Sequence, residues 1–429
     1  MDVLLLYPAD KKAYRASNSR TVYSQRLNGV PLDPAKWDPL SWTVVSKRAK
    51  DGVRIDRGGS RFPLILFSHA AQSQPINYAP TLERIASHGF VIAAPWHEGD
   101  TRDDRTIDQI NALAKKTLLT CFDGLAHTCL DPVNKAVQNG VLDFRAIIDN
   151  IGDLSDFGDR VDLEHVGVLG QSRGSVRALA SVGGSTTWGI DPVRWGTDNR
   201  RRIDAMMILA IGAASNVSNI SVDKITVPSL LVAGKLDANT PLPISVKAFK
   251  DIPAGTDKGL VVLTRATHVA YSSQVCAQTQ IQGAILDPGG LGFPNPRAIG
   301  ERLNFEGTIM SEVNGIPLDY CTYDYFVDPV DITPIVKTYT KIQVTTDNVP
   351  RTLDTDNAMR IVTELATTFF DATLVKTERA DVHFTQYTSP HFLFLKEGDE
   401  VSFAESDSFQ GRPSECDDPD MPSYNLECD

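Results

Sequence analysis

Ser172 lies in a stretch whose spacing predicts a sharp turn, and such a turn would expose the serine hydroxyl. Residues 165–175 read HVGVLGQSRGS, an apolar run that breaks into Gly-x-Ser-x-Gly and continues with helical spacing. A serine hydroxyl is a weak nucleophile, and a sharp strand-to-helix turn exposes it when small residues flank the turn. Gly170 and Gly174 stand at those flanks. We therefore predict that Ser172 is a nucleophile.

Such a serine needs a base and an acid that orients the base, in the chain order Ser, Asp/Glu, His. The apolar run at 229–233 is followed by Asp237, and the run at 260–263 is followed by His268. Loops at the carboxyl ends of parallel strands share one edge of a sheet. The order and the shared edge predict a catalytic triad of Ser172, Asp237 and His268.

Other acids and imidazoles fit this order less well. Asp204 opens its predicted strand and Asp223 precedes its strand, so both are expected at the opposite edge of the sheet. Four other histidines lie on a predicted helix, at the wrong end of the strand before Ser172, or beyond the last helix: His88, His165, His383 and His391. Position in the chain therefore favours Asp237 and His268.

Acyl transfer also needs backbone donors for the oxyanion of its tetrahedral intermediate. Where the nucleophile sits on such a turn, one donor is the residue after it and the other lies in the loop after an earlier strand. Arg173 follows the serine, and the apolar run at 62–68 leads into HAAQ at 69–72. We predict that the amides of Arg173 and Ala71 form the oxyanion hole, with Ala70 as the alternative to Ala71.

Apolar runs alternate with helical patterns along the chain, which predicts a mostly parallel sheet with helices on both faces. Strands are predicted at 2–8, 62–69, 90–94, 165–171, 203–211, 227–233 and 259–263. Helices are predicted at 80–88, 141–151, 173–182 and 356–374. The polar, Pro- and Gly-punctuated segment 11–61 is predicted to form loops.

These elements define a predicted domain organisation. We expect one catalytic domain over residues 1–387, because the strands and helices that carry the predicted site fall within it. It carries predicted insertions at about 96–140 and 270–350, where the pattern loosens. Residues 388–429 are interpreted as a C-terminal extension with a hairpin around 396–399.

The overall charge restricts the partners. The 429 residues include 54 acidic and 42 basic side chains, a net charge of −12, and no Lys/Arg block stands out. This balance argues against nucleic acid and anionic membranes as partners. No apolar run approaches the length of about 20 residues that spans a bilayer, so we expect no transmembrane segment. The expected partner is a small-molecule, lipid or polymer ester substrate, and the oligomeric state is left open.

Six cysteines bear on the compartment. None lies in a Cys-x-x-Cys motif or has the spaced histidines of a zinc site, which favours disulfides in an oxidising compartment. The chain is therefore expected to be secreted or periplasmic, with a cytoplasmic location and six thiols as the alternative. Neighbours in sequence suggest three pairs among the 15 pairings that six cysteines allow. The pairs are Cys121 with Cys129, Cys276 with Cys321, and Cys416 with Cys428.

Several of these stretches together resemble a known group of proteins. The quoted residues are FPLILFSH at 62–69, IASHGFVIAAPWHEGD at 85–100, the helical pattern at 142–151, the Gly-x-Ser-x-Gly turn, and the Asp237 and His268 loops. They are similar to the α/β-hydrolases grouped around the platelet-activating-factor acetylhydrolase-like and dienelactone-hydrolase-like esterases. The resemblance covers roughly residues 60–275 and the helix at 356–375.

The resemblance implies an α/β-hydrolase fold and a serine esterase that needs no cofactor. It also implies that a disulfide between Cys276 and Cys321 flanks the loop after the catalytic histidine. The chain departs from the group in two respects. The group usually has Gly where Ala70 stands, and dienelactone hydrolases use a cysteine nucleophile, so Ser172 argues against that particular activity.

Hydrolysis of a carboxylic ester through an acyl-enzyme is thus the main prediction, without cofactor or metal. Fold does not imply function, so a non-catalytic binding protein on the same scaffold is one alternative. A second is attack on another acyl bond, in a lactone, an amide or a perhydrolysis reaction. A third takes His97, Glu98 and Asp100, or the acidic run at 417–420, as metal ligands.

Overall fold

The structure is a computed structural model of the 429-residue chain. It describes residues 2–24, 26–27, 30–31, 43–46, 48–70, 73–98, 100, 126–155, 157–186, 202–211, 220–234, 237, 240, 242–263, 266, 268, 270–271, 309–313, 316–319, 355–375 and 401–405.

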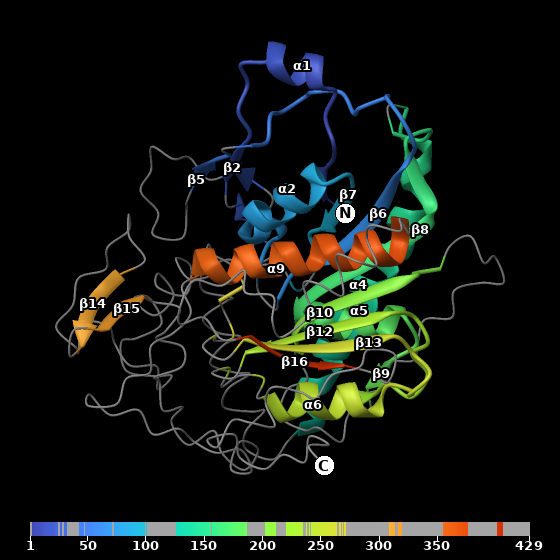
Figure 1. The fold of residues 1–429 in the computed structure, drawn as a ribbon, viewed down its shortest axis with the longest axis vertical. Coiled ribbons are helices and arrows are strands. Elements are labelled where there is room, and N and C mark those ends of the chain that lie inside the picture. Colours follow the sequence, from blue (N-terminus) through green and yellow to red (C-terminus); the bar gives the residue numbers. More distant parts are fainter. Residues whose placement is uncertain are drawn as a thin grey trace.

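A mixed sheet forms the centre of this described part, with the strand order β1-β7-β6-β8-β10-β12-β13-β16 (Figure 1). The bounds are β1 Val3–Leu6, β6 Phe62–Ser68, β7 Val91–Pro95, β8 Val161–Ser172, β10 Ala205–Ile211, β12 Ser229–Gly234, β13 Lys258–Leu263 and β16 Val401–Glu405. Neighbours from β7 to β13 run parallel, and β1 and β16 pair antiparallel at the two edges. The mostly parallel sheet expected from the sequence is confirmed.

Helices cover both faces of the sheet, which explains why its strands are apolar on both sides. In β6, Leu64 and Leu66 belong to the same core cluster as side chains of α4, α5 and α6, whereas Ile65 and Phe67 pack with α2 and α9. Figure 1 shows α9 lying across the sheet beside α2. The helices are α2 Ala79–Ser87, α4 Ala126–Asn150, α5 Arg173–Ser181, α6 Leu242–Asp251 and α9 Thr355–Phe370.

The helix predicted at 141–151 is longer than expected. It begins at Ala126, inside the segment that the sequence interpretation assigned to an insertion. Pro132 and Gly140 interrupt the helical pattern, so the first half of this helix was not predicted from the sequence. The structure explains Gly140, because a Cβ atom there would lie 2.4 Å from Cδ of the buried Arg177. Packing against another helix, not local propensity, places this glycine.

The prediction of loops throughout 11–61 is wrong in part. This segment holds α1 Lys11–Ala16, the pair β2 Val22–Ser24 and β5 Thr43–Val45, and the pair β3 Arg26–Leu27 and β4 Val30–Pro31. Such short elements leave too few residues for a recognisable period. The segment is tied to α2, since the hydroxyls of Tyr23 and Ser46 donate to Glu83 at 2.7 and 2.6 Å.

Smaller elements complete the description. Two further antiparallel pairs are β9 Ser185–Thr186 with β11 Ile220–Ser221, and β14 Ile309–Val313 with β15 Ile316–Asp319. Short 3-10 turns are Pro75–Tyr78 and Ile151–Asp153, and a π-helical turn at Asp371–Val375 continues α9. None of the helices in the described residues is long and apolar enough to cross a membrane.

The C-terminal part contributes to the central sheet through β16, which lies within the predicted extension 388–429 and pairs with β13. The hairpin predicted around 396–399 lies outside the described residues. The side chains of all six cysteines also lie outside them, so the three disulfide pairs and the oxidising compartment stay predictions. The domain boundaries stay predictions as well.

Candidate active site

The turn between β8 and α5 places Ser172 in a rarely populated backbone conformation. Its φ is 55° and its ψ is −121°, a region that non-glycine residues seldom occupy outside functional sites. Close backbone approach requires both flanking glycines. A Cβ atom at Gly170 would lie 2.2 Å from the Gly174 carbonyl oxygen, and one at Gly174 would lie 2.1 Å from the Ser68 carbonyl oxygen. The turn thus has the backbone of a nucleophile elbow.

The structure brings Asp237 and His268 to this turn. Nε2 of His268 lies 2.9 Å from Oγ of Ser172, and Nδ1 of the same ring lies 2.9 Å from Oδ2 of Asp237. Asp237 follows β12 and His268 follows β13, so the two residues occupy adjacent loops at the carboxyl edge of the sheet. With Nδ1–H donating to the carboxylate, Nε2 carries no proton and can accept the one from Ser172.

Thr240 fixes the carboxylate of Asp237. The Thr240 amide donates to Oδ1 at 2.7 Å and its hydroxyl donates to Oδ2 at 2.6 Å. Because Asp237 is buried, these donors and the histidine ring replace the water that would otherwise solvate the carboxylate. The sequence interpretation did not include Thr240. Its signal is a hydroxyl residue three positions after an aspartate, a spacing typical of side-chain-capped turns.

Gln171, the residue before the serine, connects the histidine loop to the loop after β6. Its Nε2 donates to the His268 carbonyl at 3.0 Å, and its Oε1 accepts from the Tyr78 hydroxyl at 2.8 Å. The Tyr78 oxygen in turn accepts the Ala70 amide at 3.2 Å. Burial raises the pKa of Tyr78 to about 12, so its hydroxyl remains a donor at neutral pH.

This contact bears on the predicted oxyanion hole. The Ala70 amide donates to the hydroxyl of Tyr78, which leaves Ala71 as the better of the two alternatives. Ala71 itself lies outside the described residues. Arg173 is the first residue of α5, where backbone N–H groups have no partner within the helix and the helix dipole favours negative charge.

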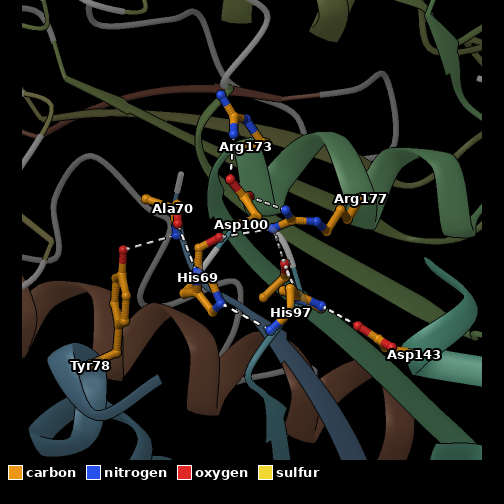
Figure 2. Close-up of polar contacts among 9 residues, drawn as sticks. His69, Ala70, Tyr78, His97, Asp100, Asp143, Arg173 and Arg177 are labelled. Carbon is orange, nitrogen blue, oxygen red and sulfur yellow. Dashed lines mark hydrogen bonds and ion pairs between the residues drawn. The ribbon is translucent and has the colours of Figure 1, made fainter. Parts of the chain in front are cut away.

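The side chain of Arg173 is held by an ion pair. It forms an ion pair with Asp100, whose second oxygen pairs with Arg177 of α5 (Figure 2). Burial alone would raise the pKa of Asp100, but the two guanidinium groups outweigh it and lower that pKa. Asp100 is therefore an ionised, doubly paired carboxylate.

The contacts of residues 97–100 do not support their role as metal ligands. Both Asp100 oxygens are taken by arginines, Glu98 is exposed, and the two ring nitrogens of His97 bond to Ser68 and Asp143. Within the described ranges, no group of three or more His, Cys, Asp or Glu side chains is arranged to hold a metal ion. The acidic run at 417–420 lies outside the described residues.

A second chain of hydrogen bonds lies beneath the loop after β6. Oγ of Ser68 lies 2.9 Å from Nε2 of His97, and Nδ1 of His97 lies 2.8 Å from Oδ2 of Asp143 on α4. Figure 2 shows His97 between Asp143 and His69. Burial, with the charge of Arg177, keeps the pKa of His97 well below its usual value. Burial raises the pKa of Asp143 to about 6.

His69 fixes the next residue of the same loop. Its Nδ1 lies 2.7 Å from the Ala70 carbonyl, and its Nε2 lies 3.5 Å from the His97 amide. These two partners assign the proton to Nδ1, because Nε2 must accept from the amide. Burial, followed by the charge of Arg177, lowers the pKa of His69 to about 4, so the ring is neutral at pH 7. The sequence interpretation gave no role to His69.

No family model matches the sequence, and no curated protein matches it. Among solved structures, the chain is similar to a ferulic acid esterase from Streptomyces cinnamoneus. The two share 16% sequence identity with a TM-score of 0.43, over 82% of this chain and 76% of the esterase. From its own strand order and its strand–elbow–helix unit, the chain has an α/β fold of the hydrolase type.

Proposed function

We propose that this protein is a serine hydrolase that cleaves carboxylic esters through an acyl-enzyme intermediate. One observation carries the proposal: His268 lies 2.9 Å from both the Ser172 hydroxyl and the Asp237 carboxylate, and Ser172 itself is held in a strained backbone conformation at its turn. Nucleophile, base and orienting acid in this geometry are the elements of acyl transfer. The chain order Ser, Asp, His supports the same function.

The first half of the reaction acylates the serine. Oγ of Ser172 attacks the ester carbonyl carbon while Nε2 of His268 takes the hydroxyl proton. Asp237 stabilises the resulting imidazolium through Nδ1–H. The tetrahedral intermediate then collapses: its C–O bond to the alcohol breaks, and the alcohol leaves with the proton from Nε2. The second half repeats these steps with water, which His268 deprotonates for attack on the acyl-enzyme, and the acid is released.

The oxyanion is assigned to the amides of Arg173 and Ala71. The Arg173 amide is supported by its place in the first turn of α5, where N–H groups point out of the helix end. Ala71 is supported by the engagement of the neighbouring Ala70 amide with Tyr78. Removal of one such donor typically costs about 3 kcal/mol of transition-state stabilisation.

The proposal is tested with Ser172→Ala on p-nitrophenyl esters of graded acyl length. We expect kcat to fall about 10⁵- to 10⁶-fold, because the covalent route is lost. The wild type, but not the variant, should also be labelled by a fluorophosphonate probe.

The matched control is Ser181→Ala, another buried serine of α5, whose hydroxyl bonds to the Arg177 carbonyl at 2.7 Å. It should keep both turnover and labelling. Retained turnover in Ser172→Ala would overturn the assignment of the nucleophile. A wild type that resists the probe and cleaves none of the esters would favour the non-catalytic binding protein.

A further inference from the structure

Two backbone segments frame Ser172, namely the first turn of α5 and the end of β6. They touch at Gly174, where a Cβ atom would lie 2.1 Å from the Ser68 carbonyl oxygen and 2.7 Å from that of His69. The first segment carries the Arg173 amide, and the second leads into the loop from which the other oxyanion donor is predicted. In the proposed function, the separation of these two segments sets the distance between the two predicted oxyanion donors.

Arg177 bridges these two segments. It lies three residues after Gly174, on the same face of α5. Its Nη1 donates to Oγ of Ser68 at 3.2 Å and to the carbonyl oxygen of His69 at 3.3 Å. The side chain is completely buried, so no water competes for these bonds. Gly140 on α4 provides the space that the guanidinium stem occupies.

Neighbouring groups hold Arg177 in this position. Its Nη2 pairs with Asp100, which also pairs with Arg173 at the start of the same helix. Ser68 accepts from Arg177 and therefore turns its own proton toward Nε2 of His97, which in turn donates to Asp143 from Nδ1. The bonds run in one direction from α5 through β6 and His97 to α4.

We propose that Arg177 is a positioning residue that sets the spacing of the oxyanion donors by bonding the end of β6 to α5. Its side chain is completely buried and bonds to Ser68, His69 and Asp100, so it acts through these residues and not on the substrate itself. The inference rests on the proposed function and adds to it a residue outside the Ser172, Asp237 and His268 constellation. A guanidinium can bond to two acceptors and a carboxylate at once, whereas an ammonium in the same place cannot reproduce that fork.

A second buried arginine provides a matched control. Arg160 donates to the carbonyl oxygens of three residues in the segment that precedes β6, at 2.9, 3.2 and 2.7 Å. These acceptors are Asp56, Gly59 and Ser60. Arg160→Lys thus changes a buried guanidinium that bonds to the chain just before β6, whereas Arg177 bonds to the end of that strand beside Ser172.

The experiment compares wild type, Arg177→Lys and Arg160→Lys by two constants. One is KM for a p-nitrophenyl ester whose acylation is slower than substrate dissociation and deacylation, so that KM reports ground-state binding. The other is Ki for phenylboronic acid, which adds to the serine and forms a tetrahedral anion. In Arg177→Lys we expect Ki to rise about 10- to 100-fold and kcat to fall by a similar factor, with KM changed less than about twofold. In Arg160→Lys, the ratio of Ki to KM should stay at the wild-type value.

Two outcomes would overturn the inference while leaving the proposed function intact. In the first, Arg177→Lys changes Ki and KM by the same factor. In the second, the ratio of Ki to KM changes equally in Arg177→Lys and Arg160→Lys. If Arg177→Lys does not fold, Ser68→Ala keeps the Asp100 pair and removes one acceptor, so a smaller rise in Ki, about 3- to 10-fold, is expected with KM unchanged. A wild type that neither cleaves the ester nor binds the boronic acid overturns the proposed function and the inference together.

Discussion

Two hydrogen-bonded series of serine, histidine and aspartate lie in the part of the protein that the structure describes. In one, His268 joins Ser172 and Asp237 at 2.9 and 2.9 Å. In the other, His97 joins Ser68 and Asp143 at 2.9 and 2.8 Å. In each series Nε2 faces the serine and Nδ1 faces the carboxylate. Side-chain geometry alone therefore does not distinguish them.

Backbone and burial separate the two series. Ser172 sits on a turn with φ of 55° directly before α5, whereas Ser68 is the last residue of β6. The His268 side chain keeps 11% of its surface exposed, and that of His97 keeps none. No substrate can reach Ser68, which is completely buried. A hydrogen-bonded serine therefore becomes a candidate nucleophile only where the fold presents it to a ligand; otherwise the same bonds hold a loop in place.

The largest expected difference follows from an isosteric change in each carboxylate. Asp237→Asn should lower kcat for a p-nitrophenyl ester about 10⁴-fold, because the amide favours the wrong histidine tautomer and cannot stabilise the imidazolium. Asp143→Asn should lower it about tenfold or less, since His97 only supports the loop. Steady-state kinetics of both variants checks this contrast. Similar losses in the two would mean that the buried series takes part in proton transfer.

A smaller effect, on stability, is expected at Gly174, where the helix that follows Ser172 touches the backbone of Ser68. Gly174→Ala should lower the free energy of unfolding by about 3 kcal/mol, because the new Cβ atom would lie 2.1 Å from the Ser68 carbonyl oxygen. Gly255→Ala is the control, since nothing lies within 4 Å of a Cβ atom there, and it should stay within about 0.5 kcal/mol of wild type. Urea unfolding of both variants measures these values. A neutral Gly174→Ala would contradict the close contact between α5 and β6.

The smallest expected effect concerns pH. Burial raises the pKa of Asp143 from its usual 3.8 to about 6, so between these values the native state binds more protons than the unfolded state. Stability contributed by this group is therefore present below about pH 4 and lost as pH rises through about 6. We expect the free energy of unfolding of wild type relative to Asp143→Asn to fall by on the order of 1 kcal/mol across this range, because the carboxylate is only partly buried.

Denaturant unfolding of the two proteins at several pH values checks this difference. Other titrating groups, including His97 and Asp100, are common to both proteins and largely cancel. A difference that rises with pH would mean that Asp143 is stabilised as an anion in the folded protein. In that case the hydrogen bond from His97 and the charge of Arg177, which both favour the anion, would outweigh the effect of burial on the pKa of Asp143.

The sequence allowed prediction of the elements that have long, regular patterns. The strands ending at Ser172 and before Asp237 and His268 are apolar on both faces, because helices cover the sheet on both sides. Shorter or interrupted elements escaped prediction. The first half of α4 was concealed by Pro132 and Gly140, and α1 is a six-residue helix within a polar segment.

The missed residues of the site have no common spacing in the chain. Tyr78 and Gln171 act through contacts made by separate elements, so no local pattern marks them. Thr240 is the exception, because it lies three positions after Asp237, to which it donates. Arg177 has no local signal either, and the sequence interpretation includes it only as one residue of the helix predicted at 173–182. Its partners Ser68 and Asp100 lie 109 and 77 positions away.

By itself, the sequence determined the candidate nucleophile, acid and base. Gly170 and Gly174 mark the turn, and parallel strands bring their carboxyl ends to one edge, so chain order was enough to select Asp237 and His268. Only the tertiary structure decided which of two serine–histidine–aspartate series faces outward. Exposure depends on what packs above a residue, and that packing comes from segments far apart in the chain.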